Sequence, residues 1–135
     1  MVPPWQPVPN SGAATEPGTK ILKHFVPGAL GGSPDGFTRL GKRTTLFAAY
    51  DTDHSNELWR TDGTTKGTKL VKDINSSDGS YPYRPVKFKK KLYFAALQDL
   101  DGKWDLWRTD GTANGTKMFK RSPGLYSVCP FRACE

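Results

Sequence analysis

Short apolar and alternating segments recur along the chain, and turns rich in Gly and Asp separate them. Two of these segments read TTLFAAY, over Thr44–Tyr50, and KLYFAAL, over Lys91–Leu97. Their length and continuous apolar character are typical of β-strands that are buried on both faces. A neighbouring segment alternates instead, which places Leu58 and Arg60 on one face of a strand and Trp59 on the other. The pattern predicts an all-β protein built from short antiparallel strands.

The strand pattern repeats along the chain. Residues 57–64 read ELWRTDGT and residues 105–112 read DLWRTDGT, 48 residues further on, and each block is followed by Gly-Thr-Lys. A degraded copy of the second half of this block lies at residues 15–23, where TEPGTKILK aligns with TTKGTKLVK at residues 64–72. The chain therefore contains two full repeats and one partial repeat.

Each full repeat predicts four strands. They span residues 37–40, 44–50, 57–61 and 69–73 in the first repeat, and residues 84–88, 91–97, 105–109 and 117–120 in the second. The Asp-Gly pairs at 62–63 and 110–111 mark tight turns between the third and fourth strands. Four short antiparallel strands in about 48 residues are typical of a propeller blade.

The stretch ELWRTDGTTKGTKLVKDI resembles the ELWxxDGT repeat family, which occurs in multi-blade bacterial surface and secreted proteins. The resemblance covers residues 15–122 and implies a β-propeller-like fold without an established catalytic centre. The chain departs from the family in copy number, because family members resemble long arrays. Closed propellers have about four to eight blades, so the expected architecture is a short or incomplete propeller.

Two segments lie outside the repeats. Residues 1–14 contain many prolines, which predicts an extended arm, because proline lacks the amide donor that helices and central strands need. Residues 123–135 form a tail with Cys129 and Cys134. A disulfide between these two cysteines is one expectation, and free thiols are the other, because the short loop contains Pro130.

The overall charge is +7, from 20 Lys and Arg against 13 acidic residues. No apolar run approaches the length of a membrane span, and the first residues resemble neither a signal nor a transit peptide. The compartment is therefore open, although the family resemblance and the cysteine pair favour an extracellular, cell-surface or organelle-lumen location. We expect protein partners or self-association, with a glycan as an alternative ligand. Nucleic acid is not expected despite the basic charge.

Basic residues occupy equivalent turns after the first strand of each repeat. These are Lys42 and Arg43 in the first repeat and Lys89, Lys90 and Lys91 in the second. Because strands in a meander alternate in direction, these turns should lie at one end of both sheets and could bind an anionic partner. The alternative is that they are solvated hairpin tips that discourage edge pairing.

Acidic residues occupy the turns after the second strand. In the first repeat Asp51, Asp53, Ser55 and Glu57 place oxygen atoms at every second residue, as calcium loops do. In the second repeat Lys103 stands where a ligand would be needed. The alternative to calcium is that Asp is simply a common turn residue; no other cofactor is expected.

Catalytic motifs are not apparent in the sequence. His24 and His54 are the two histidines, and neither has a nucleophile at a suggestive spacing. We therefore predict a non-enzymatic structural or interaction protein, such as an accessory subunit of a larger assembly. One alternative is a carbohydrate-binding module closed by oligomerisation, with Trp104, Tyr81 and Tyr83 as contact residues. Another is an enzyme whose site forms only in an assembled ring.

Overall fold

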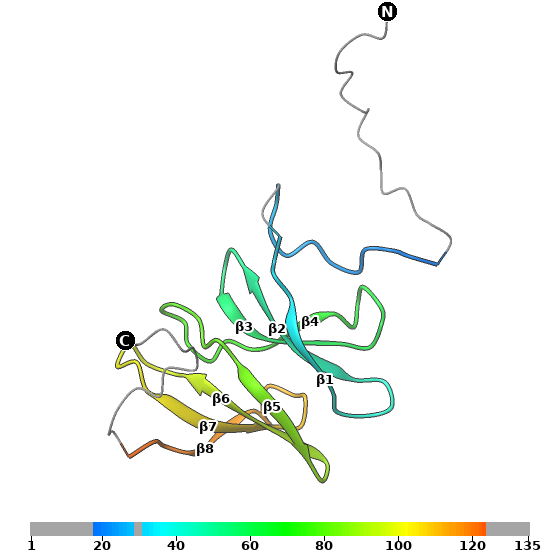
Figure 1. Cartoon of the computed structure of the whole chain (residues 1–135). Helices are drawn as coiled ribbons and strands as arrows, with labels where there is room; N and C mark the ends of the chain where they lie inside the picture. The colour runs from blue at the N-terminus through cyan, green and yellow to red at the C-terminus, as the bar shows by residue number, and fades with distance from the viewer. Residues whose placement is uncertain (1–17, 29–30, 124–135) are drawn as a thin grey trace, which may run out of the picture.

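The computed structural model describes residues 18–28 and 31–123, and these residues form two antiparallel sheets of four strands each (Figure 1). The described residues contain no helix long and apolar enough to cross a membrane. The first sheet contains β1 (Asp35–Arg39), β2 (Thr45–Asp51), β3 (Ser55–Thr61) and β4 (Lys69–Lys72). The second sheet contains β5 (Tyr83–Phe88), β6 (Lys91–Leu97), β7 (Trp104–Thr109) and β8 (Lys117–Lys120).

Both sheets are simple meanders, with strand orders β1-β2-β3-β4 and β5-β6-β7-β8. All eight strands lie within two residues of their predicted bounds. The two registers are equivalent, because Phe47 pairs with Trp59 in the first sheet and Phe94 pairs with Trp107 in the second. The all-β prediction is confirmed. The sheets are open, and β1 of the first lies beside β5 of the second (Figure 1).

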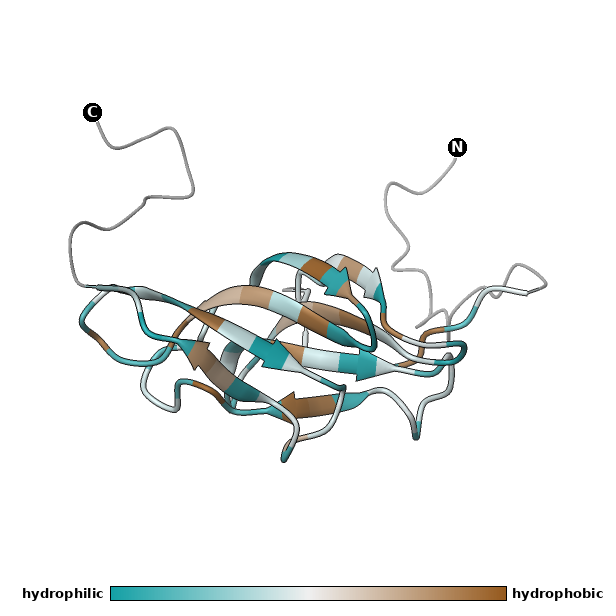
Figure 2. Cartoon of the chain, turned by 90° about the horizontal axis from the view of Figure 1, so that it is seen from below, coloured by the Kyte–Doolittle hydropathy of each residue, from teal (hydrophilic) through white to brown (hydrophobic). Residues whose placement is uncertain are grey.

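The main hydrophobic core lies between the two sheets. Figure 2 shows apolar and polar residues alternating along the strands, as expected when one strand face packs and the other does not. The core uses one face from each sheet: Leu40, Leu46, Leu58, Val71 and Ile74 from the first repeat, and Leu92, Phe94, Ala96 and Trp107 from the second.

A smaller core covers the other face of the first sheet. Here Phe47, Ala49 and Trp59 are buried, and Phe25 and Leu70 pack against them. We call the face formed by Phe47, Ala49, Trp59 and Leu70 the Trp59 face, and residues 18–28 the strap. Phe25 belongs to the strap, and its ring meets the Trp59 ring edge-on at a centroid distance of 5.0 Å.

The structure differs from the sequence-based expectation in two places. The strap contains no β-strand, although residues 15–23 resemble the end of a repeat. A lone fourth strand lacks the preceding strand that would supply its ladder hydrogen bonds, so the strap contributes Phe25 instead of a blade. In addition, β6 is buried on only one face, because Leu92, Phe94 and Ala96 alternate with half-buried residues. No described element covers its other face.

Candidate functional site

The repeated motif TDGTxxGT builds a hydrogen-bonded turn in each sheet. In the first repeat, Asp62 Oδ1 accepts hydrogen bonds from the Thr64 amide at 2.9 Å and the Thr64 hydroxyl at 2.6 Å. The Gly67 amide donates to the Thr64 hydroxyl at 2.9 Å. These bonds lower the pKa of Asp62, with the Thr64 hydroxyl as the main cause. Asp110, Thr112 and Gly115 repeat the arrangement in the second sheet, and the pKa of Asp110 is lowered for the same reason.

The motif also contacts the neighbouring sheet. Arg60 Nη1 donates to the backbone oxygen of Gly111 at 3.2 Å, and Lys72 Nζ donates to that of Thr116 at 3.2 Å. Gly111 is buried under Leu40, whose Cδ2 would lie 3.1 Å from a Cβ at that position. The Arg of one repeat therefore binds the Asp-Gly turn of the next repeat.

An apolar hollow opens on the outer face of the second sheet. We call it the open face, and it is lined by Val86, Phe88, Tyr93, Leu106 and Phe119. The hollow has a volume of about 390 Å³. Phe88 is 60% exposed and Phe119 is 53% exposed. The ring centroids of Tyr93 and Phe119 lie 5.4 Å apart. Exposed apolar surfaces of this kind commonly mark sites where another molecule binds.

The open face has a buried counterpart in the first sheet. The strand registers make Phe88, Tyr93, Leu106 and Phe119 equivalent to Leu40, Leu46, Leu58 and Val71. All four counterparts are at most 8% exposed, because the second sheet covers them. The sequence contained this signal, since the strands of the two repeats align, but only the packing of the sheets shows which face is left uncovered.

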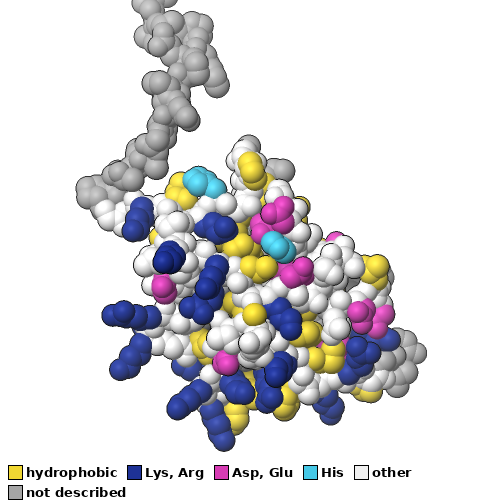
Figure 3. Space-filling view, turned by 180° about the vertical axis from the view of Figure 1, so that it is seen from behind, with side chains coloured by type: hydrophobic (Ala, Val, Ile, Leu, Met, Phe, Trp, Pro, Cys, Tyr) yellow, Lys and Arg dark blue, Asp and Glu magenta, His cyan; other side chains and the backbone are white. Residues whose placement is uncertain are grey.

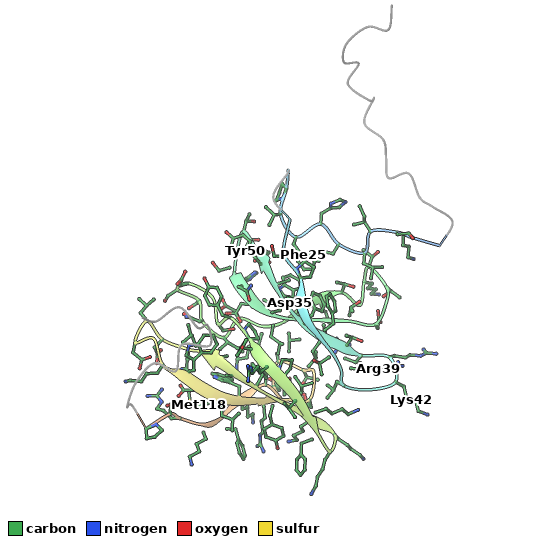
Figure 4. All side chains as sticks on the ribbon, in the orientation of Figure 1. Phe25, Asp35, Arg39, Lys42, Tyr50 and Met118 are labelled. Carbon is green, nitrogen blue, oxygen red and sulfur yellow. The ribbon has the colours of Figure 1, made fainter. Side chains whose placement is uncertain are left out.

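The predicted basic turns lie at one end of both sheets. Lys42 and Arg43 are exposed between β1 and β2, and Lys89 and Lys90 are exposed between β5 and β6, with Lys91 half-buried. Figure 4 shows Arg39 and Lys42 projecting from this end. In Figure 3 Lys and Arg side chains gather toward the lower left, away from both histidines. The structure thus brings these cations to one end and leaves all of them except Lys91 exposed.

The aromatic candidates lie near the opposite end. The rings of Trp104 and Tyr83 meet at a centroid distance of 6.1 Å, and Tyr81 is 42% exposed. Burial raises the pKa of Tyr81. Trp104 and Tyr83 therefore form a pair, which the sequence did not reveal because they are 21 residues apart.

Two of the four predicted calcium ligands, Asp51 and Glu57, accept hydrogen bonds from other residues of the protein. Asp51 Oδ1 accepts a hydrogen bond from the His54 amide at 2.6 Å, and its Oδ2 lies 3.0 Å from His54 Nδ1. Glu57 is fully buried and accepts hydrogen bonds from the Ser80 hydroxyl at 2.6 Å and the Asn75 amide at 3.0 Å. Asp53 is exposed, and Ser55 is half-buried at the start of β3. Calcium binding stays a prediction for this loop.

Two pKa shifts follow from these contacts. The hydrogen bond to Asp51 raises the pKa of His54, and burial raises the pKa of Glu57.

In the second acidic loop, a lysine side chain pairs with one of the acidic residues. Lys103 Nζ lies 3.0 Å from Asp101 Oδ2, and the Lys103 amide donates to Asp101 Oδ1 at 3.0 Å. The backbone amide of Lys103 is the main cause that lowers the pKa of Asp101. Asp105 is buried and accepts a hydrogen bond from the Ser122 amide at 2.7 Å. Over the described ranges, no group of three His, Cys, Asp or Glu residues is arranged to hold a metal ion.

Some predicted features fall outside the described residues. Cys129 and Cys134 belong to residues 124–135, and the Pro-rich arm belongs to residues 1–17. His24 lies in the strap and is exposed. Comparison with protein-family models, curated proteins and solved structures found no match.

Proposed function

We propose that the chain is a non-catalytic interaction module that binds another protein through the open face. The single observation that carries this proposal is the exposure of Phe88, Leu106 and Phe119 at positions where the first repeat is buried under a sheet. A protein surface supplies the flat apolar contact that such a sheet face needs. This is the role of a scaffold or accessory subunit, in keeping with the resemblance to the ELWxxDGT repeats.

The open face also combines features of interaction hot spots. Aromatic side chains and Arg are enriched at the centres of protein interfaces. Three of the five lining residues are Phe or Tyr, and Arg108 lies over the Phe119 ring with its Cζ at 5.5 Å from the centroid. The contact would be apolar at its centre and basic at its rim, where Lys117 and Lys120 are exposed on β8.

Site-specific photocross-linking tests this proposal. A benzophenone side chain replaces Phe119 in the full chain, and a control carries the same group at Leu100, which is 77% exposed in the β6–β7 turn. After irradiation in an extract of the native source, the Phe119 chain should form a covalent adduct with protein, and the Leu100 chain should not. Equal labelling at both positions, or no adduct at Phe119, would contradict binding at the open face.

Carbohydrate binding is a second candidate function, and the pairing of Trp104 with Tyr83 favours it. Two aromatic rings at one end of a sheet offer stacking surfaces for a sugar ring. A glycan array probed with the wild-type chain and with Trp104→Ala tests this candidate. Glycan signals that vanish in the variant would support it, and a wild-type array without signals would remove it.

A further inference from the structure

The packing of the two sheets shows what kind of surface the open face accepts. The core between the sheets joins the Leu46 and Leu58 side of the first sheet to the Phe94 and Trp107 side of the second. Phe94 and Trp107 are equivalent in register to Phe47 and Trp59 of the Trp59 face. The contact is therefore head-to-tail, with two different faces meeting. If this packing were repeated once more, a face equivalent to the Trp59 face would pack on Leu106 and Phe119 of the open face.

Hydrogen-bond donors for this next contact are present on the second sheet. Arg108 is equivalent in register to Arg60, and Lys120 is equivalent to Lys72. Arg60 and Lys72 donate to backbone oxygens of a TDGTxxGT turn in the adjoining sheet. A TDGTxxGT turn in the same place on an incoming sheet would offer Arg108 and Lys120 both backbone oxygens.

The first sheet of a second copy of this chain meets both requirements. It presents the Trp59 face, and its own TDGTxxGT turn places Gly63 and Thr68 at the positions of Gly111 and Thr116. Gly63 is exposed, whereas Gly111 is buried by the first sheet. The turn that would receive Arg108 thus lies at the surface of each copy.

The strap covers the Trp59 face of its own chain, which is the second surface that the contact would use. Phe25 packs on Trp59 and lies 6.0 Å from Phe47 between ring centroids. Lys23 Nζ stands 5.1 Å from the Trp59 ring centroid. Phe25 lies over the first sheet on the side away from the second sheet (Figure 4). The strap therefore covers the surface that a second copy would need.

We propose that the open face of one copy binds the Trp59 face of a second copy, in competition with the second copy's own strap. This inference rests on the proposed function and names its partner. Head-to-tail contacts continue until a ring closes or a filament forms. Each copy supplies two sheets, and closed propellers have about four to eight blades, so a closed ring contains about two to four copies. Because each copy carries a charge of +7, salt should strengthen the association.

Sedimentation velocity of the purified full chain over a range of concentrations tests the proposal. Wild type should form a discrete oligomer as concentration rises. Phe25→Ala should lower the concentration of half-association by about tenfold, because the competing ring is removed. The variant Phe119→Lys should remain monomeric, and Leu100→Lys serves as the charge-matched control. Far-ultraviolet circular dichroism checks that each variant is folded.

A mixing experiment tests the head-to-tail direction. Phe119→Lys loses the open face, and Leu70→Lys loses the Trp59 face, so neither should self-associate. Mixed together, they should form a heterodimer that does not grow further, because each supplies the face that the other lacks. Dimers of Leu70→Lys alone would instead show that two open faces pair, and would overturn the proposal.

Wild type and Phe25→Ala that both stay monomeric at all concentrations would also overturn it. If the Phe119 cross-linker still captured a different protein, the proposed function would stand without this inference. If it captured none, both would fail.

Discussion

At the scale of single residues, the second Gly of the TDGTxxGT motif stands at positions 67 and 115. Glycine is needed there because the side chain of the motif's Asp lies very close to it. A Cβ at either position would lie 1.9 Å from the Oδ1 of Asp62 or Asp110. That carboxylate is held in place by the amide and hydroxyl of the following Thr. Any larger residue must therefore break these bonds, so the second Gly of the motif preserves the turn that the Asp begins.

We expect Gly115→Ala to lower the free energy of unfolding by about 1–3 kcal/mol, because it displaces Asp110 from two hydrogen bonds. Gly41→Ala is the matched control, since a Cβ there meets no heavy atom within 4 Å and Gly41 lies in a comparable turn. Urea denaturation of both variants measures the difference. Similar losses in the two variants would contradict the role assigned to the Gly115–Asp110 approach.

His54 gives the first sheet a predictable pH response. Its pKa is raised, chiefly by the hydrogen bond to Asp51. A raised pKa in the folded state means that the protonated form stabilises the fold. This contribution is complete below the usual imidazole pKa of about 6.5 and is lost as the pH rises through the raised value. Because about a third of the side chain is exposed, solvent screening keeps the effect small.

We expect His54→Gln to flatten the decline in unfolding free energy between about pH 6 and pH 8. Asp51→Asn should flatten it in the same way, because it removes the carboxylate that favours the protonated imidazole. Urea midpoints measured at half-unit pH steps report the slope. A wild-type profile that rises over this interval would show that the interaction with Asp51 has the opposite sign.

At the scale of strands and turns, the two LWRTDGT blocks are alike in sequence but differ in contacts. Arg60 bonds to the Gly111 oxygen in the adjoining sheet, whereas Arg108 lies over Phe119 on the open face. The matched variants Arg60→Ala and Arg108→Ala separate these environments. In dilute protein we expect Arg60→Ala to cost about 1–2 kcal/mol more unfolding free energy than Arg108→Ala.

Thermal or chemical denaturation of the two Arg variants at low protein concentration measures this difference. Low concentration is required, because association would give Arg108 a contact like that of Arg60. Equal costs in the monomer would mean that the bond to Gly111 contributes little to the pairing of the sheets.

The strands were predictable because their signals are local. Apolar runs such as residues 44–50 and Asp-Gly turns such as 62–63 need no knowledge of the rest of the chain. Features that depend on distant partners were not predicted. The hydrogen bonds that Glu57 accepts from Ser80 and Asn75, about 20 residues away, are one example. The sequence predicts the end of a repeat at residues 15–23, and the packing of Phe25 on the first sheet is a contact that this local pattern does not show.

At the scale of the whole molecule, the candidate site is a consequence of repeat number. Each repeat offers one Leu-bearing face and one Trp-bearing face, and two repeats bury only one pair of them. The Trp-bearing face of the first repeat is covered by Phe25. The other unpaired face remains open with Phe88, Leu106 and Phe119 at the surface. The sequence predicts too few repeats for a closed ring, but the packing was needed to show that the two unpaired faces differ.

Substitutions of Leu58 and Leu106 test this difference between the covered and the open Leu-bearing faces, because the two leucines occupy the same position in the two repeats. Leu58 is 3% exposed between the sheets, and Leu106 is 38% exposed on the open face. In dilute protein, Leu58→Ala should lower the unfolding free energy by about 2–5 kcal/mol, as expected for a buried leucine. Leu106→Ala should lower it by less than about 1 kcal/mol, since much of its surface is already in water.

The dependence of these two free-energy costs on protein concentration then shows whether a second copy covers the open face. If a second copy covers the open face, Leu106 becomes buried at high concentration, and the stability of wild type increases through association. The cost of Leu106→Ala should therefore rise with concentration, whereas the cost of Leu58→Ala should stay constant. Denaturation curves for both variants at several concentrations measure this. A cost for Leu106→Ala that is the same at every concentration would show that the leucine remains in water, and that the open face awaits a different protein.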